Sequence, residues 1–143
     1  VQLADVNGDR RADVCGRGTA GIACALSSGT SFGAMRWTDN NFSNRDHWSD
    51  VPARYLSIRF ADVNGDAKAD TCGRNATGVV CQLSRGDGTF GDYRYLNNAE
   101  LRDDQGFSAE KYGMTLGLAD LSGDGRADLC ARTATGLRCA VSP

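Results

Sequence analysis

Apolar and polar residues alternate along short segments of the chain, and runs rich in Gly, Asn and Asp separate these segments. Alternation with a period of two places one set of side chains on one face of an extended strand, so it predicts β-strands. In the second of the repeats described below it predicts strands over residues 55–60, 69–74, 79–84 and 90–96. The spacing typical of amphipathic helices is essentially absent. The sequence therefore predicts an all-β fold.

One sequence unit occurs three times. The copies read ADVNGDRRADVCGRGTAGIAC from Ala4, ADVNGDAKADTCGRNATGVVC from Ala61 and ADLSGDGRADLCARTATGLRC from Ala119, at offsets of 57 and 58 residues. A period of this length, built of short strands, fits a four-stranded antiparallel β-propeller blade. We expect one domain over residues 1–143 with repeats at about 1–53, 54–111 and 112–143, the third lacking its last strand.

Two complete blades and a partial one leave open strand edges, which tend to pair with other strands. A propeller removes such edges by closing into a ring, commonly of four to eight blades. We therefore expect the chain either to be part of a longer closed ring or to associate with further copies that complete one. Because the chain starts at Val1, inside a repeat, we also expect it to have been processed or excised.

Each copy holds two cysteines nine positions apart. In a hairpin whose opposed residue numbers sum to 153, Cys72 faces Cys81 and Arg74 faces Val79, with the loop Asn75-Ala76-Thr77-Gly78 turning the chain. Zinc is the alternative, but structural zinc sites place two to four residues between paired cysteines, and eight lie between these. The predicted disulfides are Cys15–Cys24, Cys72–Cys81 and Cys130–Cys139.

Composition limits the cellular compartment and the partners that we expect for the protein. Six cysteines in 143 residues indicate an oxidising compartment, so we expect a secreted or extracellular protein. The formal net charge is -2 and the basic residues are scattered, which argues against a nucleic-acid partner. The apolar runs are only a few residues long, which argues against membrane insertion.

Oxygen-bearing side chains alternate just before each cysteine hairpin, and we name these segments the acid loops. Calcium prefers six to eight hard oxygen ligands, and it would relieve the repulsion between crowded carboxylates. By analogy with the EF-hand, a backbone carbonyl of Arg11, Lys68 or Arg126 is an expected further ligand. The predicted calcium ligands are Asp5, Asn7, Asp9, Arg11 and Asp13; Asp62, Asn64, Asp66, Lys68 and Asp70; and Asp120, Ser122, Asp124, Arg126 and Asp128. The alternative is that Asx-turn hydrogen bonds hold the loops without a metal.

The acid loops, with Phe32-Gly33 and Phe90-Gly91, resemble the FG-GAP/VCBS repeats of integrin α-subunit propellers and of many secreted bacterial proteins. The resemblance covers nearly the whole chain. It implies loops that bind calcium for structural purposes and a ring that presents a ligand-binding face. Ser122 departs from the pattern, because its hydroxyl is a weaker oxygen donor than the Asn of the other copies.

Two longer segments, residues 37–55 and 95–112, separate the repeats and carry aromatic, amide and charged residues. Loops on a rigid scaffold commonly bind ligands, and this composition is similar to that of bacterial VCBS-like propeller lectins. The candidate ligand-binding residues are Trp37, Asn41, Arg45, His47, Trp48, Tyr55, Tyr95, Phe107 and Tyr112. The alternative is that Trp37 and Trp48 form the core between blades.

Arg17, Arg74 and Arg132 recur two residues after the first cysteine of each copy, and we expect them to pair with loop aspartates rather than with a ligand. One histidine and no nucleophile signature argue against an enzyme. The sequence predicts a secreted, calcium-stabilised propeller that binds carbohydrate. The alternatives are a protein-adhesion module or a non-catalytic accessory segment of a secreted hydrolase or toxin.

Overall fold

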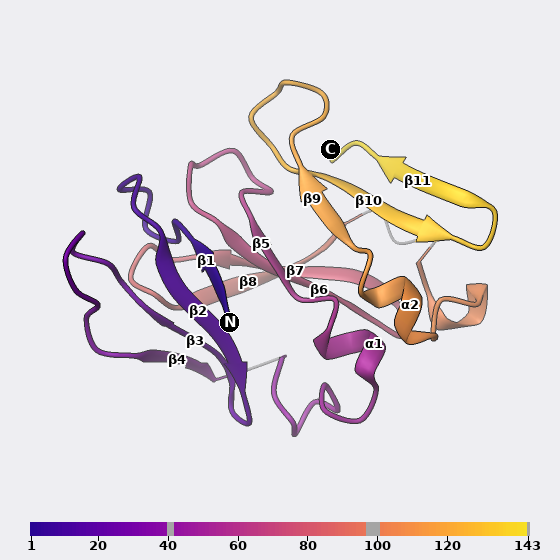
Figure 1. The fold of residues 1–143 in the computed structure, drawn as a ribbon, viewed down its shortest axis with the longest axis horizontal. Helices are drawn as coiled ribbons and strands as arrows, with labels where there is room; N and C mark the ends of the chain where they lie inside the picture. Colours follow the sequence, from indigo (N-terminus) through magenta and orange to yellow (C-terminus); the bar gives the residue numbers. More distant parts are fainter. Residues whose placement is uncertain (40–41, 97–100, 143) are drawn as a thin grey trace.

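The computed structural model describes residues 1–39, 42–96 and 101–142, which form three antiparallel sheets (Figure 1). Each sheet is one blade. Blade 1 contains β1 (Gln2–Ala4), β2 (Asp13–Gly18), β3 (Gly21–Ala25) and β4 (Arg36–Asp39). Blade 2 contains β5 (Arg59–Ala61), β6 (Asp70–Asn75), β7 (Gly78–Ser84) and β8 (Phe90–Leu96). Blade 3 contains β9 (Gly117–Ala119), β10 (Asp128–Thr133) and β11 (Gly136–Ala140).

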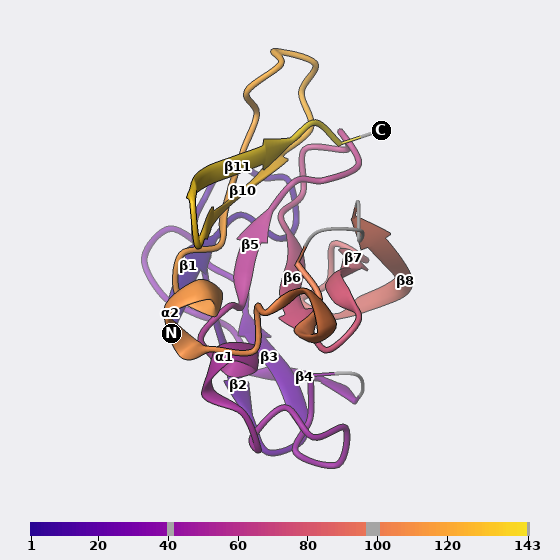
Figure 2. The same ribbon diagram turned by 90° about the vertical axis from the view of Figure 1, so that its right-hand side faces the viewer.

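The strand pairing confirms the predicted all-β, blade-like fold. In each blade the strands pair in chain order, and blade 3 has three strands within the described residues. The sheets lie one after another and do not close into a ring, as Figures 1 and 2 show from two directions. The chain is therefore a stack of propeller-like blades with two open ends.

Short helices occupy the connections between blades. They are α1 (Pro52–Tyr55), the 3₁₀ helix η2 (Asp103–Gln105) and α2 (Glu110–Gly113). α1 and α2 lie side by side, and a Cβ at Gly113 would sit 2.1 Å from the carbonyl oxygen of Ala53, so this contact requires glycine. Among the described residues, no helix has the length and apolar character needed to cross a membrane.

The predicted strand over residues 55–60 is wrong in its first half. Residue 55 ends α1, and β5 begins only at Arg59. Pro52 stands at the start of α1, where its fixed φ favours a helical turn and its missing N–H costs nothing. The amide of Leu56 then donates to the carbonyl of Pro52 and closes the turn.

The cysteine hairpins follow the predicted register. Cys15–Cys24, Cys72–Cys81 and Cys130–Cys139 are all disulfide-bonded, and the described residues include no free cysteine. Arg74 pairs with Val79 as predicted, but Asn75 also pairs with Gly78. The turn is therefore two residues long rather than four.

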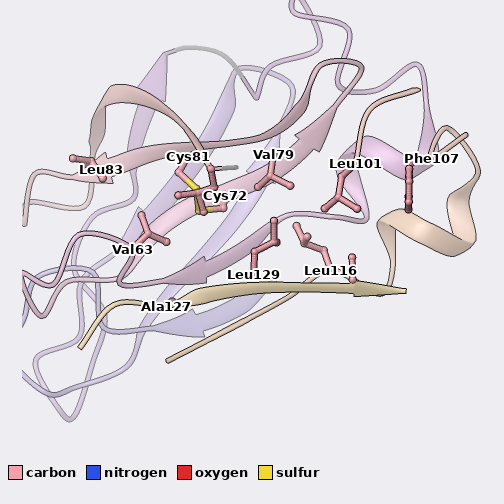
Figure 3. Packing of buried hydrophobic residues seen from close by; sticks show 12 residues of the cluster. Val63, Cys72, Val79, Cys81, Leu83, Leu101, Phe107, Leu116, Ala127 and Leu129 are labelled. Atoms are coloured by element: carbon pink, nitrogen blue, oxygen red, sulfur yellow. A yellow bond between two sulfur atoms is a disulfide. The ribbon is translucent and has the colours of Figure 1, made fainter. Parts of the chain in front are cut away.

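The hydrophobic core lies between the blades rather than within any one of them. One cluster joins blade 1 to blade 2 and includes Val6, Ile22 and Phe90. The other joins blade 2 to blade 3, where Val79 faces Leu129 across the interface (Figure 3). Every residue of β3 and of β7 is buried, as expected for inner strands covered on both faces. Each blade therefore buries apolar side chains against a neighbouring blade.

Candidate functional site

The first acid of each acid loop organises the turn through backbone hydrogen bonds. Asp62 accepts from the amides of Gly65 and Ala67, both at 2.7 Å, and Asp5 and Asp120 do the same in their own loops. Gly65 and Ala67 both have positive φ, 81° and 66°. A left-handed Ala is unfavourable by itself, and the carboxylate hydrogen bond stabilises it.

The middle positions of the loop continue this pattern. The amide of Asp66 donates to Asn64 Oδ1 at 3.0 Å, and Asp66 in turn accepts from the backbone N–H and the ammonium group of Lys68. Burial opposes ionisation of Asp66, but the hydrogen bonds from Lys68 and Asn64 outweigh it and hold its pKa below the usual range. Asp66 is therefore ionised at neutral pH.

The last acid of each loop is fully buried and joins the loop to its sheet. Asp70 accepts from the amides of Val63 at 3.0 Å and Ser84 at 2.7 Å, so one carboxylate ties the acid loop to the end of β7. Asp13 and Asp128 make the equivalent bonds in blades 1 and 3. Burial raises the pKa of Asp70 to about 6, whereas the Ser142 amide holds the pKa of Asp128 below its usual range.

The acid loops thus show the Asx-turn hydrogen bonds that the sequence left open as an alternative. In residues 1–39, 42–96 and 101–142, no group of three or more His, Cys, Asp or Glu side chains is arranged to hold a metal. The donor set nevertheless consists of carboxylate, amide and hydroxyl oxygens, which is the chemistry that calcium prefers. Each carboxylate oxygen can accept a second interaction beside its N–H bond. Calcium binding remains a prediction.

Two of the recurring arginines hold the connections between blades. The buried Arg74 donates from Nε to the carbonyl of Leu101 at 2.8 Å and from Nη2 to the carboxylate of Asp103. Arg17 contacts the carbonyl of Phe42 and the side chain of Asn44 in the same way. The partners therefore lie in the connecting segments, not in the acid loops as expected.

Three of the six predicted aromatic ligand residues pack between or beside blades. Trp48 is 3% exposed and lies 4.5 Å, centroid to centroid, from Phe42. Its indole also covers Gly73, where a Cβ would come within 2.7 Å of the ring. Phe107 packs on Tyr112 at 5.1 Å between blades 2 and 3. These side chains form core, which is the alternative that the sequence left open for Trp48.

The remaining candidates do not share one site. Trp37 is half-exposed over Gly18, and the ring of Tyr55 lines a cavity of about 190 Å³ beside Gln2 and Phe60. The exposed His47 bonds through Nδ1 to Asp50 at 2.8 Å. Arg45 is exposed on the same connection, and Asn41 lies outside the described residues.

A second cavity does bring convergent polar and aromatic groups together, and we name it the junction hollow. It holds about 220 Å³ where the segment joining blades 1 and 2 meets the hairpin turn of blade 2. Its walls are formed by Asp46, Trp48, Arg54, Asn75, Ala76, Thr77 and Tyr93. Of the predicted residues that the structure describes, only Trp48 lines it directly.

Hydrogen bonds position the polar groups of the junction hollow. The Asn75 amide group donates to the Tyr93 hydroxyl at 3.4 Å, and the Thr77 hydroxyl donates to Asn75 Oδ1 at 2.8 Å. The Tyr95 ring lies edge-on to Tyr93 at 5.1 Å, and the two hydroxyls are 3.4 Å apart. Burial, followed by the Tyr95 contact, raises the pKa of Tyr93, so its hydroxyl keeps its proton. Arg54 Nε is buried and has no hydrogen-bond partner among the residues that the structure describes.

Sequence reasoning missed Tyr93, although a signal for it was available. Residues two apart on a strand project from the same face, so the predicted strand over residues 90–96 already placed Tyr93 beside Tyr95. Asn75 and Thr77 were treated only as turn residues. Asp46 and Arg54 lie in the segment over residues 37–55 that was predicted to bind ligands, but only the packing of that segment brings them to this hairpin.

The stacked sheets, their buried junctions and the hairpin disulfides define the chain as a series of β-propeller-like blades. No protein-family model matches the sequence, and no curated protein matches it. Among solved structures, the chain is similar to an Agrocybe aegerita lectin that recognises non-reducing terminal N-acetylglucosamine. The TM-score is 0.82 and the identity 27%, over 98% of this chain and 34% of the lectin.

Two toxin structures share the fold at lower identity. The Photorhabdus luminescens Tc holotoxin pore matches with a TM-score of 0.68 and 21% identity over 99% of this chain and 6% of that one. The TcdB2-TccC3 structure without its hypervariable C-terminal region matches with a TM-score of 0.66 and 18% identity, over 96% and 6%. This chain therefore spans about a third of the lectin and a small part of the toxin chains.

Proposed function

We propose that this chain is a carbohydrate-binding module of a secreted, disulfide-bonded propeller, and that the junction hollow holds the sugar. The observation that carries the proposal is the meeting of Tyr93 with the polar groups of Asp46, Arg54 and Thr77 around one cavity, with Tyr95 packed edge-on against Tyr93 beside it. Aromatic rings contact the C–H faces of a sugar, while amide, carboxylate and guanidinium groups bond its hydroxyls. The likeness to an N-acetylglucosamine-binding lectin supports the same class of ligand.

The size of the hollow limits the ligand. Its volume of about 220 Å³ is below the roughly 300–1,000 Å³ of pockets that enclose drug-sized molecules. A single sugar residue therefore fits this space better than an extended oligosaccharide does. N-acetylglucosamine is the first probe, and no catalytic step is part of the proposal.

Removing one hydroxyl from the hollow should weaken sugar binding about tenfold, since a lost hydrogen bond costs about 1.4 kcal/mol. We expect this for Tyr93→Phe and for Thr77→Val, measured by calorimetric titration with N-acetylglucosamine. Tyr55→Phe is the matched control, because Tyr55 lines the other cavity and its variant should bind like the parent chain. If no sugar on a glycan array binds at millimolar concentration, the proposal fails and protein adhesion becomes the better interpretation.

We also propose that the acid loops bind calcium for structural purposes. The support is the threefold recurrence of oxygen donors on one turn, together with the donor chemistry described above. Ser122 provides a hydroxyl where the other loops provide an amide, so the third loop should bind most weakly.

Calcium at 100 times its dissociation constant should stabilise the chain by about 2.7 kcal/mol per site, which corresponds to a melting temperature several degrees higher. Thermal melting with added calcium and with a chelator measures this difference. Asp66→Asn should remove part of the gain while changing the calcium-free melting temperature little, because the side chain is exposed and an amide oxygen can still accept from the Lys68 N–H. Equal melting temperatures with calcium and with chelator would disprove the proposal.

A further inference from the structure

The two blade junctions inside the chain use the same surfaces. At each junction the face of one blade that carries Val6 or Val63, here named the front face, packs on the back face of the next blade. The front-face residues Val6, Val63, Ile22 and Val79 are at most 6% exposed. Phe90 on the back face of blade 2 is 1% exposed. One interface geometry is therefore repeated along the stack.

Within residues 1–39, 42–96 and 101–142, the two ends of the stack expose the same two surfaces with no blade packed on them. On the front face of blade 3, Leu121 and Leu137 occupy the positions of Val6 and Ile22, but they are 58% and 83% exposed. On the back face of blade 1, Leu3 and Phe32 stand where blade 2 has Phe60 and Phe90, and they are 67% and 54% exposed. Positions whose apolar side chains are buried at the internal junctions are thus exposed at both ends of the stack.

Backbone hydrogen bonds repeat in the same way. The amide of Ala69 donates to the carbonyl of Asp5 at 2.7 Å, and the amide of Ala127 donates to Asp62 at 2.6 Å. The next members of this series are the amide of Ala12 and the carbonyl of Asp120, at opposite ends of the stack. Within the described part of the chain these two groups make no such bond. One end therefore offers the donor and the other end the acceptor.

The contacts of the acid-loop glycines repeat from blade to blade as well. The side chain of Lys68 lies against Gly8 and that of Arg126 against Gly65, each 3.4 Å from a Cβ built on the glycine. Nothing lies within 4 Å of the corresponding point on Gly123, whose loop projects from the end of the stack in Figures 1 and 2. The residue of blade 1 that is equivalent to Lys68 and Arg126 is Arg11.

We propose that the front face of blade 3 binds the back face of blade 1 of a second copy of this chain. The contact repeats the internal junctions: Leu121 and Leu137 cover Leu3 and Phe32, and the Asp120 carbonyl accepts from Ala12. The contact is heterologous, so copies add head to tail and form a ring if the rotation closes. Gly117 occupies in blade 3 the position that Arg59 has in blade 2, and it has no side chain. The hydrogen bond that Arg59 donates to the Leu116 carbonyl at the internal junction therefore has no counterpart at the proposed contact.

Sedimentation velocity on the 143-residue chain tests the proposal. The parent chain should sediment as multiples of 15.2 kDa at tens of micromolar, whereas Leu137→Asp and Leu3→Asp should each be monomeric. Both residues are exposed in the single chain, so circular dichroism should show that both variants fold. Ser108→Asp, in the connection between blades 2 and 3, is the control and should assemble like the parent chain.

Mixing the two variants gives the decisive measurement. Leu3→Asp keeps an intact front face and Leu137→Asp keeps an intact back face, so an equimolar mixture should form a dimer of twice 15.2 kDa and nothing larger. A parent chain that stays monomeric at millimolar concentration overturns the proposal. A mixture that stays monomeric while the parent assembles also overturns it, because the copies would then use other surfaces. Neither outcome depends on sugar binding.

Discussion

Replacing Cys72 and Cys81 together with alanine should lower the free energy of unfolding by about 4 to 5 kcal/mol. The disulfide closes a loop of about ten residues, for which the loop-entropy estimate is about 2 to 3 kcal/mol. Both sulfurs are also fully buried in the cluster between blades 2 and 3, and each lost sulfur should cost about 1 kcal/mol of packing. Urea unfolding followed by the fluorescence of the buried Trp48 measures the change.

The Cys130–Cys139 disulfide provides the matched comparison. It spans the same number of residues, but Cys139 is exposed at the open end of the stack. The double alanine variant there should lose the entropic part, about 2 to 3 kcal/mol, and little packing. Equal losses for the two double variants would show that the blade junction adds nothing to the disulfide's effect.

Replacing Arg74 with methionine should cost about 3 kcal/mol. Methionine keeps much of the volume, but the Leu101 carbonyl and the Asp103 carboxylate lose their donor. Removing one partner of a buried ion pair typically costs 3–5 kcal/mol, and the partial exposure of Asp103 places this case at the lower end of that range. Chemical denaturation gives the magnitude, and hydrogen exchange over residues 101–112 should show faster opening of the connection.

The repeats supply the controls for this prediction. Arg17 makes the same bonds to neutral acceptors in a half-buried setting, so Arg17→Met should cost about 1 kcal/mol. Arg132 is exposed, and its replacement should change stability by less than about 0.5 kcal/mol. If the three variants lose the same free energy, the connecting segments do not depend on these arginines.

Both predictions concern the blade junctions, on which the proposed sugar site also depends. The junction hollow has one wall from the segment that joins blades 1 and 2 and another from the blade 2 hairpin. Trp48 lines the hollow and also packs on Phe42 and Gly73, so the same side chain serves core and site. Loss of junction packing should therefore weaken binding even when no group that contacts the sugar is changed.

The sequence determined the features that depend on neighbours within about ten residues. Strand alternation, the 57- and 58-residue offsets and the cysteine spacing predicted three antiparallel units and the pairing of Cys72 with Cys81, because hairpin partners are close along the chain. The one false strand segment lies next to Pro52, where a helical turn prevailed over the alternation.

Only the tertiary structure decided which residues of the repeats and of their connections face a partner. Trp48 is buried because blade 2 covers its ring at Gly73, whereas Leu137 is exposed because no blade within the described residues covers that face. The junction hollow is also a tertiary feature, since Arg54 and Tyr93 meet only when the segment joining blades 1 and 2 packs against blade 2. Local patterns determine the blades, and the packing of blades and connections determines the site.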